Sequence, residues 1–434
     1  MQRRNFLQNS GLALAAVSVS NPISSSRSLF DKPFDPASWD SVREQFVLDH
    51  HHIQMAQMLL ASHPAPVRKA IEEHRLAFDK SPATYWEEKA FTIEGEIRAK
   101  AAEYMSVHPD EIALTDSTTQ GLGLLFTGMD LKQGEEILST THDHYVMDKS
   151  IDYACLKNGA VNRRIDEFED PASATVEEII QTIKNAIRDE TRVLAVTWVQ
   201  SCTGVKLPIR AISEVVKEIN AGRPEDKRIY FAVDGVHGFG NQDEDISQLG
   251  CDFFIAGTHK WIFGPRGTGL VWARKEAWSF IKPTIPPFQM NPFLKWLGKS
   301  TEGEMTFNDL HTPGGFHAFD HRWALGEAFD FQMQIGRDRV HKRTTELNTK
   351  LKEGIAWMKH VHLHTPVNPD LSAGINCFEI KGVDADSVVK KFHEKGVIAS
   401  SSPYSVSYPR LTPCIINTEE EVFESLDVLN TIKV

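Results

Sequence analysis

What the sequence lacks excludes several classes of protein. The five cysteines contain no CxxC pair, so they indicate neither a zinc ligand set nor a disulfide framework. Beyond the N-terminus no apolar run is long enough to span a bilayer, and no internal repeat is present. The formal net charge of −12 argues against nucleic acid or an anionic membrane surface as the main partner. The remaining composition is that of an ordinary globular protein.

The N-terminus resembles a twin-arginine export signal. Arg3 and Arg4 precede a short, weakly hydrophobic run from Gly11 to Val19, and small and polar residues follow through Ser26. We expect residues 1–26 to direct folded protein to the periplasm. If the signal does not function, the protein stays in the cytoplasm.

Strand and helix patterns alternate from about residue 111 to residue 233, and a further apolar strand is expected over 253–256. Near-continuous apolar strands predict an α/β fold with a mainly parallel sheet covered by helices on both faces. We expect a large domain over residues 81–335, a smaller α+β domain over 336–434, and a segment over 27–80 that packs with the small domain. Single long helices are predicted for Glu87–Met105 and Arg337–Val361.

Two polar residues follow buried strands and indicate a cofactor. Asp234 ends the apolar run 229–233, and Lys260 follows the apolar run 253–256. Pyridoxal 5'-phosphate (PLP) needs a lysine for its Schiff base and an anion facing its pyridine nitrogen. Because ligands gather at the carboxyl ends of parallel strands, Asp234 and Lys260 predict a PLP site there.

Other residues near strand ends are candidates for the rest of this site. Hydroxyls at a helix N-terminus bind anions, and His259 adjoins the lysine, so the phosphate candidates are Ser117, Thr118, Thr119 and His259. Either His142 or His144 could stack on the ring, and the residues alone do not separate them. Either Ser201 or His237 could bind the ring hydroxyl. Arg410 is the candidate for a substrate carboxylate, since arginine binds carboxylates in bidentate fashion.

These residues resemble the aminotransferase class V family. The run Asp252–Gly269 is similar to the family's D-(apolar)-SGHK-(apolar)-GP-x-G-x-G signature. Asp234–His237 resembles D-G-A-[QH], Thr118–Gly121 resembles T-T-E-G, and Asp143–His144 resembles E-H, whose histidine stacks on PLP. Arg410–Glu421 is similar to R-(x)-S-x-x-x-Y-N-T-E-E-E. The resemblance covers most of the chain after about residue 45.

The resemblance implies a fold-type I PLP enzyme that works as a homodimer. It favours His144 over His142 as the stacking residue and supports Ser201 near the ring hydroxyl. The step His311–Thr312 resembles a G-T step in which the threonine reaches the phosphate of a neighbouring subunit. The serine that the family carries three residues before the lysine is Gly257 here, so one phosphate contact is lost.

The predicted function is PLP chemistry on an amino acid or amine, by an aminotransferase or an epimerase similar to the isopenicillin N epimerase branch. Sulfur transfer is disfavoured, because residues 399–407 before Arg410 offer serines but no cysteine. A kynureninase-like or β-eliminating lyase is the alternative among enzymes. A PLP-fold binding protein without catalysis is the alternative of another class. No metal site is predicted.

Overall fold

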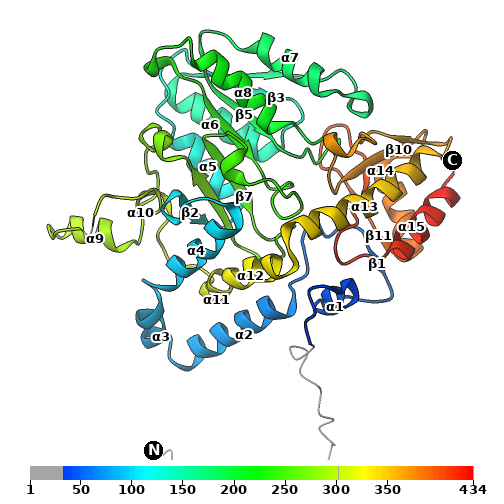
Figure 1. Ribbon diagram of the computed structural model, residues 1–434, viewed down its shortest axis with the longest axis horizontal. Helices are drawn as coiled ribbons and strands as arrows, with labels where there is room; N and C mark the ends of the chain where they lie inside the picture. Colours follow the sequence, from blue (N-terminus) through cyan, green and yellow to red (C-terminus); the bar gives the residue numbers. More distant parts are fainter. Residues whose placement is uncertain (1–32, 302, 434) are drawn as a thin grey trace, which may run out of the picture.

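The structure, a computed structural model, describes residues 33–301 and 303–433. The expected export signal over residues 1–26 lies outside this part. A large layered domain holds the first two thirds of the described chain, and a smaller domain holds the C-terminal part (Figure 1). Among the described residues, no helix combines the length and apolar character needed to cross a membrane.

A seven-stranded sheet forms the centre of the large domain. Its neighbouring strands are parallel except for β8, which runs antiparallel to both of its neighbours. In sheet order the strands are β2 (Ile112–Thr115), β8 (Gly269–Ala273), β7 (Phe253–Gly257), β6 (Tyr230–Asp234), β5 (Thr191–Thr197), β3 (Glu136–Thr140) and β4 (Val161–Ile165). The predicted fold class, a mainly parallel sheet with a smaller α+β domain, is confirmed.

Alternating side chains of the sheet join two separate cores. Ile112 and Leu114 pack into one core with helices of the first face, whereas Ala113 packs into the other with helices of the second face. The first face is covered by α4 (Ile93–Met105), α7 (Val176–Ala186), α8 (Ile209–Asn220) and α12 (Leu325–Ile335). The second is covered by α5 (Thr118–Gly128) and α6 (Tyr145–Asn158). Burial on both faces explains the continuous apolar strands.

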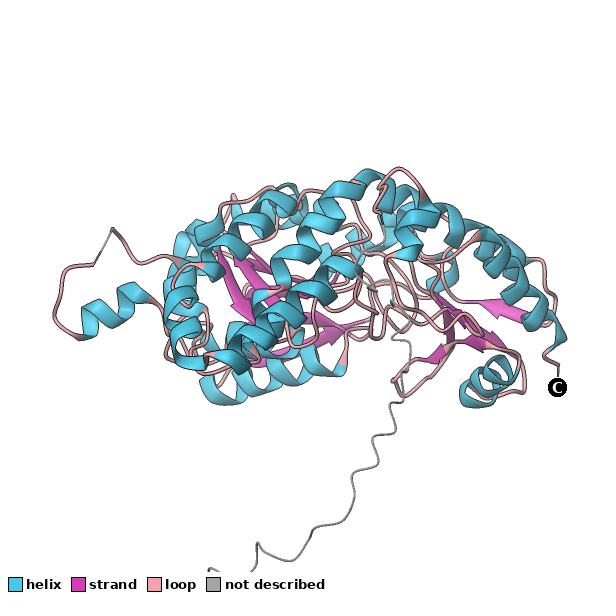
Figure 2. Ribbon diagram, turned by 90° about the horizontal axis from the view of Figure 1, so that it is seen from below, coloured by secondary structure: helices cyan, strands magenta, loops and turns pink. Residues whose placement is uncertain are grey.

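The small domain is built on a four-stranded antiparallel sheet (Figure 2). Its strands are β12 (Ser400–Ser401), β13 (Pro409–Leu411), β10 (Asn376–Ile380) and β9 (Val361–Leu363). Its helices are α13 (Arg337–Ala356), α14 (Ala385–Glu394) and α15 (Glu419–Thr431). The helix predicted over Arg337–Val361 is therefore too long: it ends at Ala356, because Val361 pairs with Ile380 in the sheet.

The N-terminal segment is shared between the two domains. It contains α1 (Trp39–Glu44), β1 (Ile53–Gln54) and α2 (Ala65–Lys80). Strand β1 pairs in parallel with β11 (Val397–Ile398) of the small domain, whereas α2 packs against α11 (Phe319–Trp323) and α12 of the large domain. The segment thus ties the two domains together.

The helix predicted over Glu87–Met105 is wrong as a single element. The chain forms α3 (Pro82–Lys89) and then α4, with Thr92 at the start of the second helix. The break lets α4 turn Ile97 and Ala101 into the core against α12, while Phe91 stays exposed. Two further short helices, α9 (Met290–Trp296) and α10 (Phe307–His311), follow the sheet in the chain.

The turn after β6 gives a test of how tightly the sheet edge is packed. A Cβ at Gly238 would lie 2.1 Å from Cε3 of Trp198, so we expect Gly238→Ala to destabilise the protein by about 1–3 kcal/mol. Gly123 in α5 has no atom within 4 Å of such a Cβ, and Gly123→Ala should be neutral or stabilising. Thermal unfolding of the two variants beside the wild type measures this. Equal midpoints for both would contradict the packing argument.

Candidate active site

The carboxyl ends of five strands meet at one cavity of about 140 Å³ in the large domain. The residues that follow β2, β3, β5, β6 and β7 all reach it, as expected for ligands at this edge of a parallel sheet. Predicted residues in its lining are Ser117, Thr118, Thr119, His144, Ser201, Asp234, His237, His259 and Lys260. The fold therefore brings together nearly all of the candidate residues.

Lys260 lies half-buried against His237. Its Nζ is 3.0 Å from Nε2 of His237, and the indole N–H of Trp261 donates to Nδ1 of the same ring at 3.3 Å. Because Nδ1 accepts that bond, a neutral His237 carries its proton on Nε2 and faces the lysine as a donor. Burial, reinforced by Lys260, lowers the pKa of His237 well below its ordinary value and keeps the ring neutral.

This environment favours the uncharged amine of Lys260. Burial lowers its pKa to about 8, with Asp234 opposing the shift and Arg410 adding to it. The amine is therefore a free base above about pH 8, whereas an ordinary lysine needs a pH above about 10. A lysine with this property can act as a nucleophile and as a proton carrier.

Asp234 supplies the anion of the cavity. It ends β6, and the backbone N–H of Val236 donates to its Oδ1 at 3.1 Å. Burial raises its pKa to about 6, while the bond from Val236 and the charge of Lys260 hold the pKa down. Above that pH the buried carboxylate is charged and fits a positively charged group in the cavity.

The structure separates the two histidines that the residues alone left open. His144 caps α6: its Nδ1 accepts from the N–H of Val146, so the proton of the neutral ring lies on Nε2. Burial lowers its pKa, and its ring lines the cavity. His142 instead binds the buried Glu167 at 3.0 Å and stacks on Phe168 at 4.6 Å, outside the cavity lining.

The N-terminus of α5 provides a site for a phosphate. Ser117 caps the helix by accepting from the N–H of Gln120, and the buried Oγ1 of Thr118 has no hydrogen-bond partner among the described residues. An orphaned hydroxyl beside a helix N-terminus in the cavity fits an anion. The packing also explains why position 257 is a glycine, because a Cβ there would lie 2.7 Å from Oγ1 of Thr118.

His259 completes this end of the cavity. Burial lowers its pKa to about 4, with Lys260 contributing, so its ring is neutral. Its backbone oxygen accepts from the N–H of Ala61, which holds the N-terminal segment against the Lys260 strand end. This bond connects the N-terminal segment to the strand end that carries Lys260.

Arg410 lies behind the cavity, in the small domain. Its guanidinium donates to the backbone oxygens of Ser201 and Ser401 and to Oγ of Ser400, and its side chain is 2% exposed. It forms no ion pair with a carboxylate of the described residues, although burial lowers its pKa. A buried cation without an anion is suited to receive an anionic ligand group.

Thr312 does not reach this cavity. Its hydroxyl donates to Oδ1 of Asn308 at 2.7 Å and accepts from the N–H of Leu114 at 3.1 Å, and the residue is buried. Within its own chain, Thr312 fastens α10 to the edge strand β2.

Two residues near the site carried no sequence signal. Thr197, the last residue of β5, lines the cavity and binds the buried Asp143. Tyr404 places its hydroxyl 2.8 Å from Oγ of Ser201, and its ring meets His144 edge-on at 5.9 Å. Burial raises the pKa of Tyr404, so its hydroxyl stays protonated. A serine-rich loop gives no indication of such a contact, because it forms only when the domains pack.

The residues present fit PLP. The cavity offers a nucleophilic amine, a buried carboxylate, a neutral imidazole and an unpartnered hydroxyl at a helix N-terminus, which match the aldehyde, pyridinium, ring face and phosphate of that cofactor. The described residues contain no cluster of acidic, histidine or cysteine side chains suited to a metal ion.

Comparison with known proteins agrees with this geometry. Residues 64–422 match the family described as aminotransferase class V. Isopenicillin N epimerase of Streptomyces clavuligerus is 24% identical over 91% of this chain and 98% of its own length. A probable cysteine desulfurase of Pyrococcus abyssi is 23% identical over 83% of this chain and 87% of its own length.

Solved structures show the fold. A mutant of C-DES, with glycine covalently linked to its PLP cofactor, superposes with a TM-score of 0.79 at 20% identity and covers 90% of this chain and 99% of its own. The cysteine desulfurase of Thermococcus onnurineus gives a TM-score of 0.74 at 19% identity, over 90% and 97% of the two chains. Family, fold and site agree, and this chain belongs to the aminotransferase class V family of PLP-dependent, fold-type I proteins.

Proposed function

We propose that this protein is an enzyme that removes and returns the α-proton of an amino acid, as an aminotransferase or an epimerase. The observation that carries the proposal is the buried Lys260 amine, facing neutral His237 and charged Asp234 in one cavity, with Arg410 behind it. Bound PLP supplies an electron sink for the charge that proton removal leaves on the substrate.

Different side chains of the cavity would bind the different groups of PLP. Lys260 would provide the covalent attachment, Asp234 would pair with the ring nitrogen, and His144 would cover the ring. The hydroxyls at the N-terminus of α5, with neutral His259, would bind the phosphate. Ser201 is the better partner for the ring hydroxyl, because both nitrogens of His237 already face Trp261 and Lys260.

Once released by substrate, Lys260 is placed to carry the proton. Its pKa of about 8 leaves a fraction of the amine uncharged at neutral pH and most of it uncharged above pH 8, so Nζ can accept a proton and return it. His237, whose Nε2 faces Nζ, orients the amine. Return of the proton to a different atom or face separates transamination from epimerisation, and both begin with the same group.

Sulfur transfer through a cysteine is not supported by this site. All five cysteines are buried, and burial raises the pKa of every thiol, so none is a ready nucleophile; they are Cys155, Cys202, Cys251, Cys377 and Cys414. The likeness to relatives named as cysteine desulfurases therefore does not carry sulfur transfer to this chain.

A β-eliminating lyase is the second candidate. Elimination needs an acid for the leaving group, and the protonated hydroxyl of Tyr404 lies beside Ser201 on the Arg410 loop. One structurally similar protein is the cystine C–S lyase C-DES. We place this candidate second, because a likeness at 20% identity carries the fold and not the reaction.

A deuterium experiment tests the proposal. With D₂O and a panel of amino acids, we expect exchange of the α-hydrogen, followed by keto-acid formation or inversion; release of pyruvate, ammonia or sulfide would favour the lyase instead. Lys260→Ala should lower exchange by about 100-fold or more, whereas exposed Lys395→Ala should not. Bound PLP with no exchange for any amino acid would favour a non-catalytic binding protein.

Arg410 gives a prediction about substrate class. We expect Arg410→Met to raise KM for amino acids by roughly 10- to 100-fold, because a charged hydrogen bond to the carboxylate is lost. Turnover of an amine that lacks a carboxylate should change little. Arg343→Met, which removes an arginine paired with Glu419 in the same domain, is the matched control. An equal loss for both substrates would show that Arg410 serves the fold alone.

We also propose a homodimer as the working form, on the resemblance to the family. Measuring the molar mass of the protein in solution tests this proposal: twice the mass of one chain supports the homodimer, and the mass of a single chain contradicts it.

We further propose export to the periplasm through residues 1–26. A pair of reporters, one with the full N-terminus and one with Arg3 and Arg4 replaced by lysine, measures it by cell fractionation. Export of the first and retention of the second is the expected outcome, and equal distribution would refute it.

A further inference from the structure

A basic hollow lies at the edge of the large sheet opposite the cofactor cavity. It encloses about 450 Å³, and the cations in its lining are Arg210, Lys217, Arg223, Arg228 and Arg274. Strand β6 leads from Arg228 at this hollow to Asp234 in the cofactor cavity, a span of about 20 Å for extended chain. The basic hollow is therefore a separate place, which a small ligand of the cofactor cavity does not reach.

The lining carries more positive than negative charge, although the whole chain has a formal net charge of −12. The acidic side chains in the lining are Glu214, Glu225 and Asp252. Two of them are already paired: Glu214 lies 3.6 Å from Lys217, and Asp252 lies 2.7 Å from Arg228. Arg210, Arg223 and Arg274 form no ion pair with the described residues, so the basic hollow attracts anions.

Asp252 fixes the positions of two of these arginines. Its Oδ1 accepts from the guanidinium of Arg228, and its Oδ2 accepts from the N–H of Phe231 at 2.9 Å. Its backbone oxygen accepts from the N–H of Arg274 at 2.9 Å. Because Arg228 precedes β6, Asp252 precedes β7 and Arg274 follows β8, three neighbouring strands of the sheet bring these side chains together.

Most hydrogen-bond donors of Arg228 and Arg274 are unused. Apart from its bond to Asp252, the guanidinium of Arg228 donates to no described residue, and that of Arg274 donates only to the backbone oxygen of Cys251, at 2.9 Å. The Nε atom of each arginine is buried and has no hydrogen-bond partner among these residues. Buried polar atoms without a partner are rare, and a ligand with several acceptor oxygens would satisfy these donors.

Helix α8 forms the other wall of the basic hollow. Gly250 lies in the left-handed region with φ of +79°, and a Cβ there would lie 2.2 Å from Oγ of Ser213 in α8, so the glycine lets the chain before β7 approach the helix closely. Arg210 and Lys217 lie about two helical turns apart on one face of α8, and both are exposed. Their long side chains can therefore close over a ligand that Arg228 and Arg274 hold.

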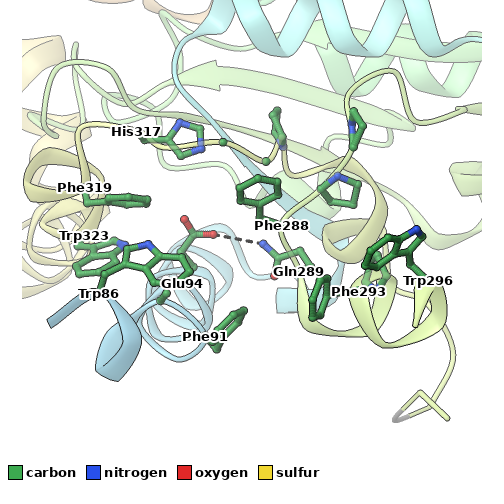
Figure 3. A pocket seen from close by; sticks show the side chains of 17 residues that line it. Trp86, Phe91, Glu94, Phe288, Gln289, Phe293, Trp296, His317, Phe319 and Trp323 are labelled. Carbon is green, nitrogen blue, oxygen red and sulfur yellow. Dashed lines mark hydrogen bonds between the residues drawn. The ribbon is translucent and has the colours of Figure 1, made fainter. Parts of the chain in front are cut away.

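The chemistry of this lining fits a phosphate group on a small molecule. A guanidinium binds phosphate through two parallel hydrogen bonds. The positive charge is confined to the hollow, and the negative charge of the rest of the chain would repel a long polyanion. Another hollow, of about 480 Å³ and lined by aromatic side chains such as Trp86 and Phe288, has no lysine or arginine in its lining (Figure 3). The gathering of cations is thus particular to the basic hollow.

We propose that the basic hollow binds a small molecule through a phosphate group, at a site separate from that of the cofactor. The ligand is placed between Arg228 and Arg274 at the sheet edge and is covered by Arg210 and Lys217 from α8. This site does not depend on which reaction the cofactor cavity performs.

The test uses the full chain loaded with PLP, so that the phosphate end of the cofactor cavity is occupied. Calorimetric titration with inorganic pyrophosphate should give a dissociation constant tighter than about 1 mM. Arg210→Gln together with Arg274→Gln should weaken this binding by roughly 10- to 100-fold, because charged hydrogen bonds to the phosphate oxygens are lost. The matched control is Lys381→Gln with Lys395→Gln, which removes the same charge from exposed positions of the small domain and should leave the affinity unchanged.

Each other outcome overturns a stated part of the proposal. If pyrophosphate does not bind, or binds the arginine variant as tightly as the wild type, or is weakened equally by the control, the site is wrong. Succinate that binds as tightly as pyrophosphate overturns the phosphate class. Loss of the PLP absorbance during titration places the anion in the cofactor cavity and overturns the separate site.

Circular dichroism checks that the arginine variant is folded. If it is not, Arg210→Gln with Lys217→Gln takes its place, since both side chains are exposed on α8 and their loss leaves the sheet edge intact. We expect weaker pyrophosphate binding in this variant as well, and an unchanged affinity equally overturns the site.

Discussion

The burial of one lysine constrains the rest of the active site. A charged ammonium inside the sheet edge would cost several kcal/mol of desolvation, so its surroundings must favour the amine. His237 does this by presenting a neutral ring whose tautomer is set by Trp261. Asp234 opposes the shift only in part, which leaves a pKa of about 8 for Lys260 and about 6 for Asp234. A reactive base and a fixed anion thus lie in one small cavity.

The cost of burying a charge also bears on Arg410, the candidate residue for binding a substrate carboxylate. Arg410 is held by carbonyl and hydroxyl oxygens, which satisfy its hydrogen bonds but leave its charge without a counterion among the described residues. The neutral ring of His259 and the hydroxyl of Thr118, which has no hydrogen-bond partner among the described residues, can likewise bind an anion. Bound PLP and a bound anionic substrate would therefore stabilise the folded protein as well as take part in the chemistry, because each supplies charges that the described residues of the cavity lack.

The site also lies across the boundary between the domains. Arg410 and Tyr404 belong to the small domain, yet both bind Ser201 of the large one. The N-terminal segment reinforces this junction through the pairing of Ile53 with Val397 and through the bond from Ala61 to His259. A substrate carboxylate bound at Arg410 would consequently affect the contact between the two domains as well as Arg410 itself.

The sequence by itself determined the alternation of strands and helices and the positions of Asp234 and Lys260, because apolar periodicity and residues at strand ends are local properties. It did not determine the break between α3 and α4, which depends on how α4 packs against α12. Nor could the residues alone, without the resemblance to the family, separate His142 from His144 or place Tyr404 beside Ser201. Only the tertiary structure decided these features, since each depends on contacts between residues far apart in the chain or on the direction in which a side chain points.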